Sequence, residues 1–122
     1  MNKIKWVTQA IAQSCDIQKS LFPDFVNVAD ELAVEWEMAL DELNDLNIAS
    51  LITAQQLNSI KKLDDYMLSI SGPNNIQYWN NIALCQSEEW QKMREMAIDI
   101  LSIMKWEKKI PSKSKAIYIN HG

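Results

Sequence analysis

The sequence predicts an all-α protein, a single-domain bundle of four to five helices followed by a short extended C-terminal tail. Apolar residues recur at helical spacing along most of the chain, and several stretches begin with residues that cap helices. Only two of the 122 residues are glycine, and one of them is the last residue. Tight β-hairpins and bulges depend on glycine at positive φ, so this scarcity argues against a β-rich fold.

The first expected helix covers about residues 3–20, and a second runs from a cap at Asp24 or Asn27 to about Asn44. The first is supported by four apolar residues at helical spacing: Ile4, Val7, Ile11 and Cys15. On the second, one arc of the helical wheel is apolar and predicts a core face: Val28, Ala29, Leu32, Ala33, Trp36, Ala39, Leu40 and Leu43.

The third helix has the clearest boundaries. Thr53 and Gln56 have the spacing of a capping box, and Gly72 followed by Pro73 ends the helix. Its predicted buried arc comprises Leu57, Ile60, Leu63, Met67, Leu68 and Ile70. Asp64 falls inside that arc, and a buried carboxylate is costly without a partner. We therefore expect Asp64 at the edge of the arc, paired with Lys61 or bonded to a Trp or Tyr donor.

A short helix is expected at about 76–85, and Ser87 caps a last long helix over about 88–109. Glutamates open this helix and lysines close it, as the helix dipole favours: Glu88 and Glu89 at one end, Lys105, Lys108 and Lys109 at the other. Trp106 lies off its apolar stripe and is expected to anchor the tail. These elements divide the chain into a bundle domain at 1–111 and a basic tail at 112–122, in which residues 116–120 are extended.

The composition excludes several classes of function. One internal glycine cannot form a glycine-rich phosphate loop, and a single histidine, His121, leaves little for metal sites or catalytic triads. The net charge of −4 disfavours direct nucleic-acid binding, and no apolar stretch approaches the length of a membrane span. We expect a non-enzymatic protein with no cofactor and no metal. Cys15 and Cys85 have no metal-site spacing, so we expect buried thiols in a cytoplasmic protein.

The second helix also has an unusual polar side. Eight acids and no base lie between Asp24 and Asp45, and Val34 and Met38 interrupt the acidic side. An apolar centre with a charged rim is typical of an interface, and methionine adapts to binding surfaces. The predicted partner-binding residues are Asp30, Glu31, Val34, Glu35, Glu37, Met38, Asp41, Glu42 and Asp45. Two alternatives stay open: a merely solvated face, or a face covered by the basic tail with Ile117 and Ile119.

Two segments, FPDFVNVADELAVEWEMALDEL and SEEWQKMREMAIDIL, resemble small immunity proteins of bacterial polymorphic toxin systems, those of contact-dependent growth inhibition above all. The resemblance covers roughly residues 20–105 in style and includes no diagnostic motif. It implies a cytoplasmic protein that binds and neutralises one cognate toxin domain, a basic one and often a nuclease. An acidic surface can imitate the nucleic-acid substrate and block a basic cleft.

Two other classes remain as alternatives. One is a homo-oligomeric or adaptor protein, such as a phage or secretion-system accessory component, although identical acidic faces would repel in a symmetric dimer. The other is a small Mg²⁺-dependent hydrolase that uses Glu31 and Glu35 with Asp64 and Asp65, but the repeated ExxE pattern of such enzymes is missing. A toxin gene directly upstream would favour the immunity function.

Overall fold

The computed structural model describes residues 2–45 and 51–114. The regular secondary structure of this part is entirely helical, without strands, so the all-α prediction is confirmed. The elements are α1 (Asn2–Ile11), α2 (Cys15–Ser20), α3 (Val28–Asp45), α4 (Ala54–Ser69), the 3₁₀ helix η2 (Pro73–Tyr78), α5 (Asn81–Gln86) and α6 (Glu88–Met104). The expected extended segment at 116–120 lies outside the described residues.

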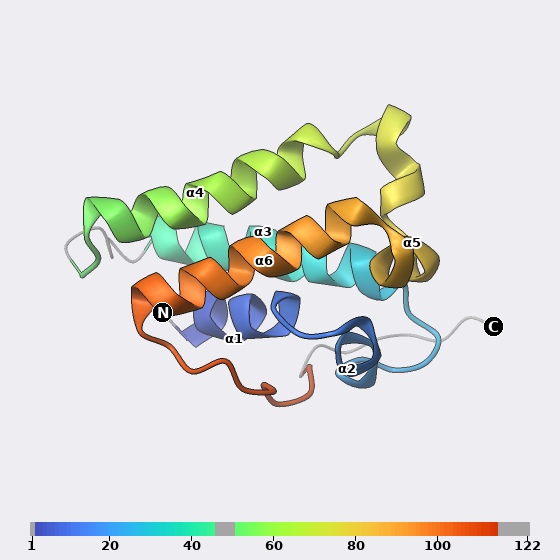
Figure 1. Cartoon of the computed structure of the whole chain (residues 1–122), viewed down its shortest axis with the longest axis horizontal. Coiled ribbons are helices and arrows are strands. Elements are labelled where there is room, and N and C mark those ends of the chain that lie inside the picture. The colour runs from blue at the N-terminus through green and yellow to red at the C-terminus, as the bar shows by residue number, and fades with distance from the viewer. Residues whose placement is uncertain (1, 46–50, 115–122) are drawn as a thin grey trace.

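The four longest helices form the bundle (Figure 1). Helix α6 crosses in front of α3, α4 runs along one side of this pair and α1 along the other. The closest packing joins α4 to α6 and α1 to both α3 and α6. The short α2 and α5 lie together at one end. The largest side chains of the core are fully buried between these helices: Ile4, Ile11, Leu32, Trp36, Ile60, Leu63, Leu84, Trp90, Met93, Ile100 and Leu101.

Three predicted helix starts are confirmed by their caps. Asn27 Oδ1 accepts the backbone N–H of Asp30 at 3.3 Å, just before α3. Thr53 and Gln56 form the capping box of α4, with the two reciprocal bonds at 3.1 and 2.8 Å. The Ser87 hydroxyl accepts the N–H of Trp90 at 3.1 Å at the start of α6. These contacts are local, which is why the order of residues predicts them.

The prediction of a single helix over 3–20 is wrong, because the helix is interrupted between α1 and α2. Ser14 caps α2 by accepting the N–H of Ile17 at 3.5 Å. The buried Gln18 then turns back, and its Nε2 donates to the carbonyls of Ala10 and Ile11 at 3.2 and 3.0 Å. These bonds satisfy the carbonyls at the end of α1 and allow the chain to turn there.

Two further boundaries differ from the prediction in the middle of the chain. The helix expected at 76–85 is divided into η2 and α5, because Asn80 caps a new helix by accepting the N–H of Ala83 at 2.8 Å. Helix α4 ends at Ser69, and Gly72 follows with the positive φ of 99° that its lack of a side chain permits. Leu68, expected in the core, is 65% exposed near this end of α4.

The last helix is shorter than predicted, since α6 ends at Met104 and not near residue 109. Lys105 has a left-handed φ of 59°, and the N–H of Trp106 donates to the carbonyl of Leu101 at 2.9 Å. This pattern is a Schellman motif, which ends a helix and turns the chain aside. Trp106, which was expected to anchor the tail, packs half-buried against the core.

Residues 105–114, called here the C-terminal strap, cross α1 after this turn. Their backbone carbonyls accept hydrogen bonds from two α1 side chains and from Gln13, two residues beyond α1: Glu107 from Gln9 at 2.9 Å, Lys109 from Gln13 at 2.9 Å and Ser112 from Trp6 at 2.7 Å. The N–H of Ser114 donates to Leu21 O at 2.9 Å. The carbonyls of Glu107 and Lys109, which helical N–H groups would satisfy if α6 continued, thus bond to Gln9 and Gln13 instead.

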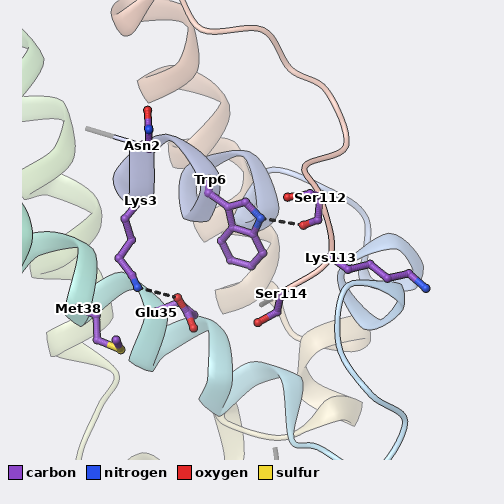
Figure 2. A pocket seen from close by; sticks show the side chains of 8 residues that line it. All are labelled: Asn2, Lys3, Trp6, Glu35, Met38, Ser112, Lys113 and Ser114. Carbon is purple, nitrogen blue, oxygen red and sulfur yellow. Dashed lines mark hydrogen bonds and ion pairs between the residues drawn. The ribbon is translucent and has the colours of Figure 1, made fainter. Parts of the chain in front are cut away.

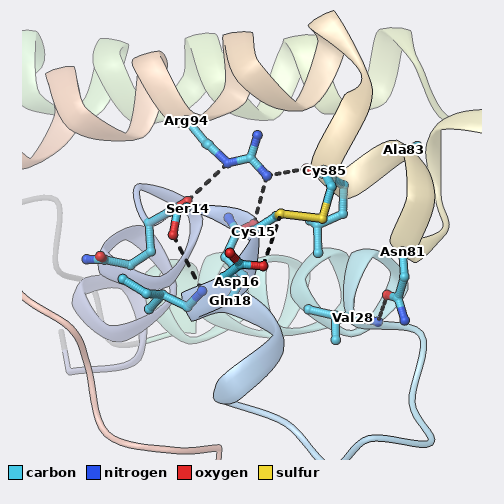
Figure 3. The surroundings of a disulfide bond; sticks show 12 residues. Ser14, Cys15, Asp16, Gln18, Val28, Asn81, Ala83, Cys85 and Arg94 are labelled. Carbon is cyan, nitrogen blue, oxygen red and sulfur yellow. Dashed lines mark hydrogen bonds between the residues drawn. A yellow bond between two sulfur atoms is a disulfide. The ribbon is translucent and has the colours of Figure 1, made fainter.

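The expectation of two buried thiols is also wrong. Cys15 and Cys85 form a disulfide between the start of α2 and the end of α5, with their Cα atoms 5.1 Å apart (Figure 3). Cys85 is exposed and Cys15 is half-buried. The two cysteines are 70 positions apart, so the sequence gives no sign that they pair, and the packing of α2 on α5 brings them together.

A buried arginine reinforces the same junction (Figure 3). Arg94 of α6 donates through Nε to the carbonyl of Gln13 at 3.0 Å and through Nη2 to Gln18 Oε1 at 3.0 Å. The same nitrogen donates to the carbonyl of Leu84. Burial lowers the pKa of the Arg94 guanidinium from its ordinary value. Arg94 and the disulfide therefore hold the α1–α2 turn against α5 and α6.

Candidate partner-binding surface

Helix α3 places the predicted surface residues. Its apolar arc faces the core as predicted, with Ala33 and Leu40 half-buried and the other six residues buried. On the opposite side, Val34 is 45% exposed and Met38 is 47% exposed. These two side chains, one helical turn apart, are the exposed apolar centre that the sequence predicts.

The predicted acids divide into two groups on either side of this apolar centre. Asp30, Glu37 and Asp41 are exposed on the outer side. The acids on the other side are less exposed: Glu31 and Glu42 are half-buried, and Glu35 is buried. Asp45 is the last residue of α3, and its side chain lies outside the described part of the structure. Together, Asp30, Val34, Glu37, Met38 and Asp41 form what is called here the outer acidic face.

Asp30 has a structural task within this face. Its Oδ2 accepts from Asn27 Nδ2 at 3.1 Å, and the same nitrogen donates to the carbonyl of Trp79 at 2.8 Å. Partial burial raises the pKa of the Asp30 carboxyl from its ordinary value. Asp30 thus fixes the start of α3, while Glu37 and Asp41 extend further into solvent.

The helical wheel predicts that Glu35 lies on an exposed acidic rim, but in the structure Glu35 is buried. Lys3 of α1 lies beside Glu35, with Nζ 3.6 Å from Oε2. Helix α1 packs along α3 and covers this side of it. The wheel cannot reveal this neighbour, because α1 precedes Glu35 by more than twenty residues in the sequence.

A groove opens between α3 and the C-terminal strap (Figure 2). Its volume is about 470 Å³, within the usual range of ligand and side-chain pockets. Its walls include Trp6 and Lys3 of α1, Glu35 and Met38 of α3, and residues 112–114 of the strap. Two of the predicted site residues therefore line a hollow, together with an aromatic residue that the sequence analysis did not select. Lys3 and Trp6 are one turn apart on α1, and this spacing was the one feature of the sequence that could have placed both on the same wall.

The remaining predictions concern Asp64, the tail, metal sites and membrane spans. Asp64 Oδ1 accepts a hydrogen bond from the indole N–H of Trp36, which is one of the two kinds of partner expected for this carboxylate. Ile117 and Ile119, the residues proposed to cover Val34 and Met38, lie outside the described residues. Within residues 2–45 and 51–114, no three His, Cys, Asp or Glu side chains are grouped to hold a metal ion. Among the helices of this same part, none has the length and apolar character needed to cross a membrane.

Comparisons with protein-family models, with curated proteins and with solved structures find no match to this chain.

Proposed function

We propose that this protein is a non-enzymatic binding protein that neutralises a cognate bacterial toxin domain through the outer acidic face of α3. The observation that carries the proposal is the exposure of Val34 and Met38 beside Glu37 and Asp41. An apolar centre that is desolvated on binding, with a charged rim around it, is the usual anatomy of a protein interface. The flexible thioether of Met38 suits a surface that must fit another protein.

The charge of the face selects a basic partner. The stretch from Asp24 to Asp45 has eight acids and no base, and on the exposed side of α3 Glu37 and Asp41 flank the apolar centre. The negative field of such a face steers a positively charged surface toward it and repels acidic competitors. A nuclease needs positive charge to hold phosphates, which fits the resemblance to immunity proteins of polymorphic toxins. We propose a nuclease domain as the partner and no direct contact with nucleic acid or membrane.

The compartment can be tested through the cysteines. A nuclease toxin acts on nucleic acid in the cytoplasm, so the proposal places neutralisation there. The Cys15–Cys85 disulfide, in contrast, is typical of oxidising compartments, because cytoplasmic thiols are kept reduced. Alkylation inside living cells followed by mass spectrometry separates the two. Two alkylated cysteines support the cytoplasm, and a protected pair contradicts this part of the proposal.

The function itself is tested by co-expression with the toxin encoded beside this gene. The wild-type protein should rescue growth, and the Glu37→Lys, Asp41→Lys double variant should bind at least about tenfold more weakly because like charges then meet. A matched control is Glu95→Lys, Asp99→Lys, which reverses two exposed acids at the same spacing on α6. Equal rescue and equal affinity for both variants would contradict a role for the outer acidic face.

A second candidate, a self-associating adaptor, is favoured by one observation. Ile76 of η2 and Ile82 of α5 are each 71% exposed. Exposed apolar side chains near each other in the chain can serve as a contact between copies. Light scattering after size exclusion tests this: a concentration-dependent dimer that Ile76→Ser, Ile82→Ser abolishes would favour the adaptor.

A further inference from the structure

We propose that the groove between α3 and the C-terminal strap receives an arginine side chain of the partner. This inference rests on the proposed function, since it assigns a specific contact to a basic protein that binds α3. It adds a second contact point to the outer acidic face, on the other side of Met38.

Trp6 provides the aromatic wall of the groove (Figure 2). Its indole Nε1–H donates to the carbonyl of Ser112 at 2.7 Å, so the polar edge of the ring is already used by the strap. Trp6 therefore contributes the apolar remainder of its ring to the wall of the groove. A guanidinium stacks on such a ring through its flat face, and Trp is the best of the aromatic side chains for this contact. Met38 lies on the α3 wall, where its thioether can pack against the methylene stem of an arginine.

Glu35 provides the charge that selects a cation. Its carboxylate lies on the α3 wall of the groove, largely shielded from solvent, with Lys3 Nζ 3.6 Å away. Lys3 therefore shows that a cation is accommodated next to Glu35, although this distance is too long for a hydrogen bond. An arginine can add two parallel N–H···O bonds to the same carboxylate, which an ammonium group cannot do.

Lys113 also lines the groove, but its side chain points away from Trp6 and Glu35 (Figure 2). Glu35 is thus the acid that a basic side chain would meet on the wall of the groove, and Lys3 is the cation with which it would compete.

The probe is the blocked tripeptide acetyl-Gly-Arg-Gly-amide, titrated into the full chain and followed by ¹⁵N and methyl NMR. The Trp6 indole signal, assigned by its loss in Trp6→Phe, and the Met38 methyl signal should shift and saturate together. The control probe carries citrulline in place of arginine, which keeps the shape and removes the charge. Saturation with arginine and not with citrulline is the expected result. Equal shifts with both peptides, or no saturable shift, overturn the proposal.

Two variants should change the affinity for the arginine peptide in opposite directions. Glu35→Gln should weaken binding of the arginine peptide by about two- to fivefold, and Lys3→Met should strengthen it by a similar factor because the competing cation is gone. Matched controls are Glu95→Gln on α6 and Lys5→Met on α1, which should leave the affinity unchanged. Weaker binding in Lys3→Met overturns the proposal even if Glu35→Gln fails to fold. Failure here leaves the charge-reversal test at Glu37 and Asp41 unaffected, so the two proposals fail separately.

Discussion

The indole Nε1–H of Trp36 on α3 donates to Oδ1 of Asp64 on α4 at 3.2 Å, joining two helices through one polar contact. Trp36 is among the largest fully buried side chains of the protein, and Asp64 is half-buried. The bond explains how a carboxylate can lie inside the apolar arc of α4: it satisfies a buried donor that has moved out of water.

Removing the acceptor should therefore destabilise the fold. Asp64→Ala should lower the free energy of unfolding by about 1–3 kcal/mol, because the indole N–H is left unpaired. Asp64→Asn keeps an acceptor and should lose less. Urea unfolding followed by fluorescence measures both. Asp65→Ala, at the exposed neighbour, is the control, and an equal loss there would argue against the importance of this bond.

Loss of the disulfide should lower the free energy of unfolding more than loss of the Asp64 hydrogen bond does. The bridge closes a sequence separation of 70 residues, and Cys15→Ser with Cys85→Ser should lower the free energy of unfolding by roughly 2–4 kcal/mol. The same loss should follow from a reducing agent. Urea titrations with and without dithiothreitol check it. A wild-type protein whose stability does not respond to the reductant would contradict a bridged native state.

Arg94 should be coupled to that bridge. The ammonium group of Arg94→Lys cannot bond to all three acceptors of the guanidinium. The variant should therefore lower the free energy of unfolding by about 1.5–3 kcal/mol and the melting temperature by several degrees. Combined with the two serine substitutions, the losses should not add, because both interactions hold the same turn. The double-mutant comparison is made by calorimetry. Strict additivity would show that the two act independently.

The glutamines under the strap should determine its protection from proteolysis. Gln9→Ala with Gln13→Ala removes two hydrogen bonds to the strap, each worth about 1 kcal/mol. Trypsin should then cleave after Lys108 and Lys109 sooner than in the wild type, as mass spectrometry of a time course would show. Gln91→Ala, an exposed glutamine on α6, should leave the cleavage rate unchanged. Unaltered cleavage in the double variant would mean that other contacts secure the strap.

Met38 distinguishes an interface from a covered surface. Met38→Ala should leave the melting temperature nearly unchanged, since the side chain is 47% exposed, and should weaken toxin binding by about 1–2 kcal/mol. Thermal unfolding and calorimetric titration measure the two effects. If residues 112–122 cover Met38 instead, their deletion and Met38→Ala should both reduce stability, and their effects should not add.

The accuracy of the sequence predictions follows the range of the interactions. Caps depend on residues three positions away: those at Thr53 and Ser87 are correct, and Asn27 is the one of the two expected candidates, Asp24 and Asn27, that caps α3. The buried arc of α3 is also correct, because helical periodicity alone determines it. Asp64 shows the limit: a donor was expected, but two classes of partner stayed open until α3 was packed against α4.

Several of the misses depend on contacts between residues that are distant in the sequence. Glu35 faces Lys3, Cys15 meets Cys85, and Lys109 binds Gln13 in place of continuing α6. A lysine-rich end is favourable for a helix, so residues 105–109 looked helical on local grounds. Local preference was weaker than the hydrogen bonds that α1 donates to the strap.

The strap also has a consequence for how the chain is made. Trp6 and its acceptor Ser112 are 106 positions apart, so a ribosome that adds roughly 5–20 residues per second produces them some 5–20 s apart. During that interval, Gln9 and Gln13 have no strap to bind, and α1 cannot complete its contacts. Helix α1 is thus made well before the strap residues that secure it, and nascent chains that stop before residue 105 should be especially sensitive to proteases.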